Sequence, residues 1–370
     1  MSLPAILSRP QGSEWPELAA GEAGMNRLWL EEAARFAAAN EIPWPYDLKQ
    51  HLESGYFEPA PFNEILGPVR SRGQTNGLVL RSGAKVVSWG DTQQVDFTFS
   101  AAKSYLSMLA GIAIMDRLIA DLDEPVGRTI RDGGFDGPHN GAVTWRQLLQ
   151  NTSEWEGSLF GKSDIIDRNR NLAVEGQGRK GNLRPLRRPG EHWEYNDVRV
   201  NRLSLALLRR FGRPLPEVFA ERIMQPIGAS TDWSWHGYRT SGVDVEGRII
   251  ESVSGGTHWG GGMLIHAEDQ ARLGLLMLRR GEWNGKRVLP ASWVAESLCP
   301  CPLKPTYGFL WWLNTDHGRY QSAPEASFFA SGAGGNLTWI DPDHDLVAVT
   351  RWLDPTAIDS FIRLIMQAIE

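Results

Sequence analysis

The stretch from residue 98 to residue 120, TFSAAKSYLSMLAGIAIMDRLIA, restricts the possible folds more than any other part of the chain. Thr98 and Ser100 are residue types that cap helix N-termini, and the side chains that follow are mostly apolar until Asp116. A helix that is apolar nearly all round is buried, because an exposed helix keeps one polar face. Its apolar part is too short to span a bilayer. We therefore expect the rest of the chain to pack around this central helix.

Both ends of the chain show strand patterns, and the middle is mostly helical. Two apolar runs at 77–83 and 84–90 are separated by Ser-Gly, which favours a tight hairpin turn. From residue 307 onward, strand-like runs alternate with Pro, Asp and Gly turns, and a helix is expected over 356–369. The pattern predicts one sheet completed by both ends of the chain, with a helical insertion packed against it.

Composition excludes some classes of partner. With 370 residues the chain can bury a large core, in one large domain or two closely packed ones. A net charge of −6 argues against a nucleic-acid partner, because binding to phosphates needs a basic face.

Cysteine usage and the first residues bear on location. Cys299 and Cys301 are the only cysteines, and a bridge between such near neighbours would be strained, so no disulfide framework is expected. The opening MSLPAILSRPQGSEWPE has no apolar region after a basic start, which indicates no secretory signal. The expected location is cytoplasmic, although a chain whose leader had been removed would look the same.

The central helix begins with the pattern S-x-x-K at Ser100 and Lys103. Residues three apart on a helix are neighbours, so the lysine amine can reach the serine hydroxyl. An amine of lowered pKa can take the serine proton, and burial near another cation would lower the pKa of Lys103. In the alternative interpretation the serine only caps the helix. A second match, Ser82 to Lys85, lies in the hairpin turn and is expected to be structural.

Tyr195 is a second candidate for the chemistry. It lies in GEHWEYND, after a Pro-Gly turn and just before an amphipathic helix. A phenol held near a lysine can become a phenolate and act as a general base. Taken alone, such a tyrosine is more often a buried residue with a satisfied hydroxyl.

Together these motifs resemble those of the serine β-lactamase-related hydrolases, a superfamily of class C β-lactamases, family VIII-type esterases, DD-peptidases and 6-aminohexanoate-dimer hydrolases. The matching elements are S-x-x-K at Ser100–Lys103, Y-x-N at Tyr195-Asn196-Asp197, and the strand triad K-T-G or H-x-G at Ala330-Ser331-Gly332. Supporting similarities lie at 148–153, 260–269 and 341–347, so the likeness covers roughly residues 65–370.

The resemblance implies an α+β fold of the β-lactamase/transpeptidase-like class, an antiparallel sheet flanked by helices with an all-helical subdomain over the site. Residues 1–64 would form an N-terminal extension with a helix, and residues 65–370 the hydrolase domain. Within that domain, the α/β part would comprise about 65–110 and 265–370, and the helical subdomain about 111–264.

The resemblance also implies roles for individual residues. Ser100 would be the acylated nucleophile, with Lys103 and Tyr195 as general base and acid. The backbone N–H groups of Ser100 and Ala333 would form the oxyanion hole. Further residues expected at the substrate site are Ser331, Gly332, Asn196, Asp197, His258 and Trp259. No cofactor or metal is expected, and His344 with its neighbouring aspartates is interpreted as a strand turn.

Two departures from the family pattern bear on the substrate. Asp197 replaces a usual Asn, and Ala330 replaces the Lys or His that helps to hold a carboxylate. We therefore expect a small-molecule ester or amide substrate in place of a β-lactam, for a monomer or homodimer without a membrane partner. The alternatives are a catalytically silent ligand-binding protein on the same fold, and a D-amino-acid peptidase or weak β-lactamase.

Overall fold

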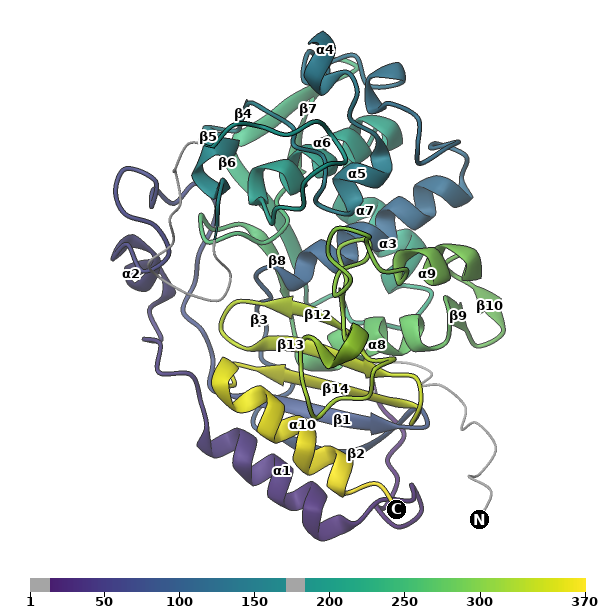
Figure 1. Cartoon of the computed structure of the whole chain (residues 1–370). Coiled ribbons are helices and arrows are strands. Elements are labelled where there is room, and N and C mark those ends of the chain that lie inside the picture. The colour runs from purple at the N-terminus through teal and green to yellow at the C-terminus, as the bar shows by residue number, and fades with distance from the viewer. Residues whose placement is uncertain (1–13, 171–183) are drawn as a thin grey trace.

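The computed structural model describes residues 14–170 and 184–370. At its centre is helix α3 (Ala101–Met115), with Ser100 as its N-cap (Figure 1). Every residue of α3 from Ala101 to Ala113 is buried. The prediction of a central buried helix is therefore confirmed.

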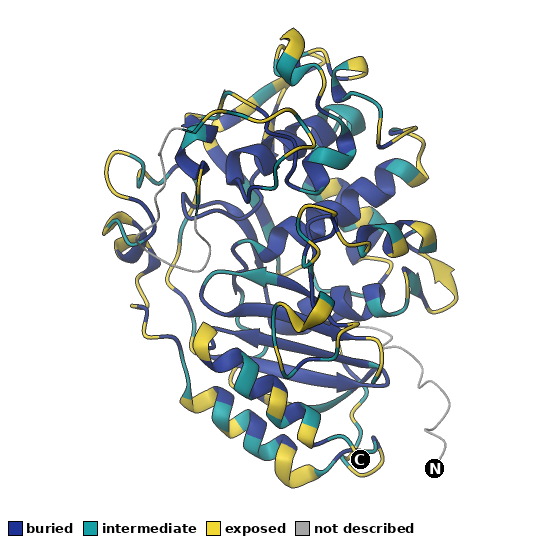
Figure 2. Ribbon diagram, viewed as in Figure 1, coloured by how far each residue is buried: buried dark blue, intermediate teal, exposed yellow. Residues whose placement is uncertain are grey.

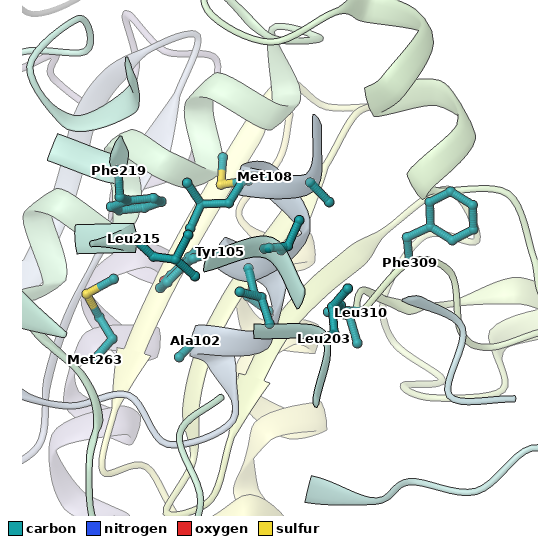
Figure 3. Close-up of a cluster of buried hydrophobic side chains, with 14 of the residues drawn as sticks. Ala102, Tyr105, Met108, Leu203, Leu215, Phe219, Met263, Phe309 and Leu310 are labelled. Carbon is teal, nitrogen blue, oxygen red and sulfur yellow. The ribbon is translucent and has the colours of Figure 1, made fainter. Parts of the chain in front are cut away.

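Helix α3 is covered by side chains from several distant parts of the chain. Figure 3 shows Tyr105 and Met108 of α3 among residues of α7 (Leu215–Phe219), and these belong to one large core cluster. Other labelled members of that cluster are Ala102, Leu203, Met263, Phe309 and Leu310.

The main sheet is antiparallel and has six strands in the order β11-β12-β13-β14-β1-β2. Their bounds are β11 (Trp312–Leu313), β12 (Phe328–Gly332), β13 (Asn336–Asp341), β14 (Leu346–Arg351), β1 (Asn76–Arg81) and β2 (Ala84–Trp89). Strand β1 pairs with β14 in the middle of the sheet, with Leu78 opposite Val349. The predicted sheet built from both ends of the chain is confirmed.

The β1–β2 hairpin turns at Ser82 and Gly83, whose φ angles of 53° and 81° are both positive. Two positive φ angles match the right-handed twist of a hairpin, and glycine adopts them without strain. Lys85 forms an ion pair with Glu17, 3.0 Å away. The second S-x-x-K match is thus structural, as expected.

Helices cover both faces of the main sheet. On one face lie α1 (Arg27–Ala39) and α10 (Ile358–Gln367), packed on alternate side chains such as Val79 and Ala348. On the other face lie α3 and α8 (Ala267–Leu278), packed on Leu78 and Val349. In Figure 2 the inner strands β1, β13 and β14 are dark blue, while the outer sides of α1 and α10 are exposed. This layered arrangement confirms the α+β class.

The region expected to be wholly helical contains a long hairpin as well. Strands β6 (Ser234–Val245) and β7 (Arg248–Val253) turn at Glu246 and Gly247, with positive φ at both. With β8 (Gly262–Ile265) and β3 (Asp96–Phe97) they form a sheet in the order β3-β8-β6-β7. Because β3 leads directly into α3, this second sheet fixes the start of the central helix.

The remaining elements are short or lie above α3. They are α2 (Leu48–Glu53), α4 (Gly137–Asn140), α5 (Trp145–Leu149), β4 (Ser158–Leu159), β5 (Lys162–Ser163), α6 (Asp197–Phe211), β9 (Glu282–Trp283), β10 (Lys286–Arg287) and α9 (Ala291–Ser297). There are also 3₁₀ turns η1 (Val126–Arg128), η2 (Asp164–Asp167), η4 (Thr315–His317) and η5 (Pro355–Ala357), and a π-helical turn η3 (Ala220–Met224). Within the described ranges, no helix has both the length and the apolar character needed to cross a membrane.

The close packing of α3 leads to a stability prediction at Gly111. A Cβ atom there would lie 2.4 Å from Cδ1 of Trp293. We expect Gly111→Ala to lower the free energy of unfolding by about 1–3 kcal/mol, the usual cost of overpacking, in a denaturant titration. Met115→Ala, at an exposed position of the same helix, should change it by less than about 0.5 kcal/mol. A Gly111→Ala variant more stable than the parent, as helix propensity alone would give, would contradict this packing.

Candidate active site

Ser100 and Lys103 meet at the first turn of α3. The Nζ atom of Lys103 donates a hydrogen bond to Oγ of Ser100, over 2.8 Å. The Ser100 hydroxyl makes no capping bond to the helix and instead donates to the carbonyl oxygen of Gly256, 3.3 Å away. The capping interpretation is therefore not observed, and the hydroxyl stays available for chemistry.

The backbone around Ser100 is tightly constrained. Phe99 has a φ of 47°, a left-handed conformation that is costly for a bulky residue and is typical of functional sites. A Cβ atom at Gly256 would lie 1.9 Å from the carbonyl oxygen of Phe99, so only glycine fits there. The glycine-rich segment thus holds the turn that presents Ser100.

Lys103 is almost fully buried and contacts three oxygen atoms. They are Oγ of Ser100 at 2.8 Å, Oδ1 of Asp197 at 2.8 Å and the carbonyl of Gly255 at 3.1 Å. The contacts with Ser100 and Gly255 are hydrogen bonds, and the contact with Asp197 is an ion pair. Burial lowers the pKa of Lys103, but the charges of Asp197 and Tyr195 outweigh it and raise this pKa. The expectation of a lowered pKa was wrong, because a buried carboxylate lies beside the amine.

Asp197 is itself surrounded by cations. Nη1 of Arg170 lies 3.1 Å from its Oδ2, and Nδ1 of His258 lies 3.8 Å from the same atom. Burial raises the pKa of Asp197, but Lys103, Arg170 and His258 together hold it well below its usual range. Asp197 is therefore a carboxylate, and it anchors Lys103 from the first residue of α6.

Tyr195 lies beside this charged group, as its place in the motif predicts. Nζ of Lys103 is 5.2 Å from the centre of the Tyr195 ring, and Cζ of Arg170 is 5.4 Å from it. The ring of Trp312 stacks on that of Tyr195 at a centroid distance of 5.7 Å and an angle of 25°. The fold thus brings Tyr195 next to the Ser100–Lys103 pair.

The end of strand β12 completes one side of the site. A Cβ atom at Gly332 would lie 1.9 Å from the carbonyl of Thr98 and 3.1 Å from the amide nitrogen of Ala101. Gly332 therefore lets β12 pass against the start of α3, and Ala333 follows it directly. Ser331, the preceding residue, accepts a hydrogen bond of 2.9 Å from Nη2 of Arg319. The oxyanion hole of Ser100 and Ala333 remains a prediction.

Three candidate site residues have structural partners. Oδ1 of Asn196 accepts from the first amides of α6 and its side chain is fully buried. Trp259 is also fully buried, and its Nε1 donates to Glu58 and to the carbonyl of Phe62. His258 bonds the carboxylate of Glu58 through Nε2. The substrate-binding roles expected for Asn196 and Trp259 stay predictions, and both side chains have protein partners in this structure.

The site also contains residues that the motifs did not indicate. Glu58 comes from the N-terminal extension, Arg170 from the segment after η2, and Trp312 and Arg319 from β11 and the loop after it. Among these, only Trp312 carries a signal, as part of the aromatic run YGFLWWL. The others are single charged residues that reach the site through the fold.

Glu154 and Trp155, which follow the 148–153 segment, are both buried. The carboxylate of Glu154 contacts Arg184 and Arg199, each at 2.7 Å. Burial raises the pKa of Glu154, but these arginines outweigh it and lower the pKa to about 2. Glu154 therefore holds the region above α3 together and does not face a ligand.

Comparisons with known proteins give the family and the fold of the chain. The family model described as Beta-lactamase matches residues 81–351. No curated protein matches the sequence. A putative 6-aminohexanoate-dimer hydrolase from Bacillus anthracis superposes with a TM-score of 0.59 at 19% identity, over 98% of this chain and 88% of that one.

Two further solved structures share the fold. A family VIII carboxylesterase has a TM-score of 0.58 at 16% identity, over 93% of this chain and 98% of that one. A putative beta-lactamase from Bacteroides dorei DSM 17855 has a TM-score of 0.58 at 16% identity, over 87% and 96%. At these identities the superpositions establish the fold.

The ion cluster of Glu154 gives a prediction for stability against pH. Its pKa is about 2 in the folded protein and 4.5 in the ordinary range, so its ionised form stabilises the fold above pH 4.5. Glu154→Gln leaves two arginines without their partner and should cost about 3–5 kcal/mol at pH 7. Because the wild type loses this contribution as pH falls below 4.5, the difference in melting temperature should narrow there.

The control is Glu296→Gln, which removes a carboxylate from the more exposed ion pair with Arg146. It should change stability by less than about 1 kcal/mol. An equal loss of stability for Glu154→Gln at pH 7 and at pH 3 would contradict the role given to its charge.

Proposed function

Since the chain belongs to the β-lactamase family, we propose that it is a serine hydrolase that cleaves an ester or amide bond through an acyl-enzyme on Ser100. The observation that carries the proposal is the 2.8 Å hydrogen bond from Lys103 to Ser100, at the N-terminus of a buried helix. Negative charge that develops at this point is stabilised by the helix dipole and by backbone N–H groups.

The contacts of Lys103 favour different roles for Lys103 and Tyr195. As an ammonium with three acceptors, Lys103 donates to Oγ of Ser100 and stabilises the alkoxide. The proton acceptor is then Tyr195. A phenolate there is attracted by Lys103 and Arg170, whose charges lie 5.2 and 5.4 Å from the ring centre.

The reaction proceeds in two halves. Oγ of Ser100 attacks the carbonyl carbon while its proton passes to the oxygen of Tyr195. The tetrahedral oxyanion is held by the backbone N–H groups of Ser100 and Ala333, and Tyr195 returns the proton to the leaving oxygen or nitrogen. In the second half, water attacks the acyl carbonyl while Tyr195 takes its proton. Tyr195 then returns the proton to Oγ of Ser100, and the free acid leaves.

The bond cleaved is an ester or an amide. Both chemistries occur in the names of the similar structures, a carboxylesterase and a 6-aminohexanoate-dimer hydrolase. Ala330 is fully buried and pairs with Thr338, so that position offers no cation to a ligand. This feature motivates the alternatives of a silent ligand-binding protein and of a D-amino-acid peptidase or weak β-lactamase.

Covalent labelling tests the nucleophile. After exposure to a fluorophosphonate, intact mass should show one adduct, mapped to Ser100, and Ser100→Ala should lose both the adduct and at least about 1,000-fold of ester turnover. Ser107→Ala, another buried serine of the same helix, is the matched control and should keep both. An unlabelled wild type would favour the silent binding protein, and turnover retained by Ser100→Ala would exclude Ser100 as nucleophile.

The role of Lys103 can be tested through Asp197. Asp197→Asn removes the charge that raises the pKa of Lys103, so the ammonium is lost at a lower pH than in the wild type. If activity needs the ammonium, the alkaline limb of the kcat/KM profile should move to lower pH than in the wild type.

The opposite result is also informative. If neutral Lys103 were the base, Asp197→Asn would raise activity near pH 7, which would overturn this mechanism. Asp269→Asn removes an equally buried carboxylate, paired with Arg272 in α8, and should leave the pH profile in place. Thermal melts of both variants should show that each keeps the fold.

A further inference from the structure

Glu58 is a buried carboxylate that the N-terminal extension places against the glycine-rich segment, residues 254–262. Only 1% of its surface is exposed. Its Oε1 atom bonds Nε2 of His258, and its Oε2 atom accepts from Nε1 of Trp259. Because burial of a carboxylate is costly unless the group is paired, these two bonds hold Glu58 in one position. Glu58 therefore fixes two consecutive side chains of the segment.

The same segment bonds both side chains of the S-x-x-K pair. The carbonyl of Gly255 accepts from Nζ of Lys103 at 3.1 Å, and the carbonyl of Gly256 accepts from Oγ of Ser100 at 3.3 Å. Only one residue separates Gly256 from His258 in the sequence. A shift of the segment would therefore move the two carbonyls that align the amine and the hydroxyl.

The ring of His258 also reaches the ion pair of the site. Its Nδ1 atom lies 3.8 Å from Oδ2 of Asp197, the carboxylate that pairs with Lys103. The ring of Phe57, the residue before Glu58, stacks on His258 at a centroid distance of 5.0 Å and an angle of 19°. The extension thus holds this ring by a hydrogen bond at its edge and by an aromatic contact on its face.

Backbone contacts hold the other end of the segment without Glu58. The amides of Leu66 and Gly67 donate to the carbonyl of Trp259 at 2.8 and 3.0 Å, and the carbonyl of Phe62 accepts from its Nε1 at 3.0 Å. Loss of the Glu58 carboxylate should therefore loosen the part of the segment that faces the site and leave its end attached.

We propose that Glu58 is a positioning residue of the active site, which holds the two backbone carbonyls that bond Lys103 and Ser100. The inference rests on the proposed hydrolase function. Glu58 lies outside residues 81–351, which the family model matches, so the match does not include this role. Misplacement of a reacting group by about 1 Å can cost on the order of 100-fold in rate, so a distant residue that fixes its place affects catalysis strongly.

The first test replaces the carboxylate by an amide. Glu58→Gln keeps the size of the side chain but offers one oxygen acceptor to two donors. With p-nitrophenyl butyrate, kcat should fall by about 10–100-fold and KM should change little, because the lost contact orients groups and does not bind substrate. The rate constant for labelling of Ser100 by a fluorophosphonate should fall by a similar factor.

Two further variants separate positioning from packing and from general destabilisation. Glu58→Asp keeps both acceptor oxygens but loses volume, so it should retain more activity than Glu58→Gln. The reverse order would indicate packing and overturn the proposal. Glu41→Gln is the matched control, because Glu41 belongs to the same extension and pairs with Arg72 at 2.6 Å. It should lower the melting temperature and leave kcat unchanged, and an equal fall of kcat in both glutamine variants would also overturn the proposal.

His258→Asn tests the same link from its other end. It removes the ring that Glu58 bonds, so kcat should again fall. The double variant with Glu58→Gln should lose no more than the larger single loss, because both changes break one link. Losses that multiply would contradict the proposal. If Glu58→Gln does not fold, a folded His258→Asn variant with full kcat would overturn it.

The results also distinguish failure of this inference from failure of the proposed function. Thermal melts set an assay temperature at which every variant is folded. Turnover that depends on Ser100, with kcat unaffected by Glu58→Gln, would refute the positioning role and keep the hydrolase. A wild type that neither turns over the ester nor reacts with the fluorophosphonate would refute the hydrolase and this role with it.

Discussion

The buried ion pair between Lys103 and Asp197 joins the two parts of the molecule that form the site. Lys103 belongs to α3, which packs on the main sheet, and Asp197 begins α6, which lies in the region above it. Two charges this deeply buried are stable only if each is fully paired, because desolvation of either one costs several kcal/mol. Their contact therefore fixes the distance between the two regions, and with it the distance from Tyr195 to Ser100.

Further polar contacts connect the Lys103–Asp197 pair to the N-terminal extension. His258 connects Asp197 to Glu58, and Glu58 also accepts from the indole of Trp259. The backbone follows the same route, since the amide of Leu66 donates to the carbonyl of Trp259. Residues before the family match at 81–351 thus belong to the architecture of the site. These residues pack against the glycine-rich segment, in which Gly256 contacts the backbone of Phe99 beside Ser100.

Local patterns were sufficient to predict the central helix, the Ser100–Lys103 pair and the hairpin, because each depends on residues a few positions apart. The motif also placed Tyr195 correctly. Spacing alone could not give the charge state of Lys103, since its partner Asp197 lies on another helix. The place of Arg319 in the site could not be predicted from sequence either, because it depends on the hydrogen bonds of Asn314 within an irregular loop. Sequence proximity could not give the partners of Asn196 and Trp259, whose side chains form a helix cap and a buried hydrogen bond.

The pairing of β1 with β14 has a consequence for how the protein is made. Strands β1 and β2 are synthesised early, but the other neighbour of β1, strand β14, leaves the ribosome only after a delay of roughly tens of seconds at ordinary rates of synthesis. During that interval the apolar surface of α3 has no finished sheet to pack against. Such long-range pairing slows folding and leaves apolar surface exposed to solvent until the last strands are made.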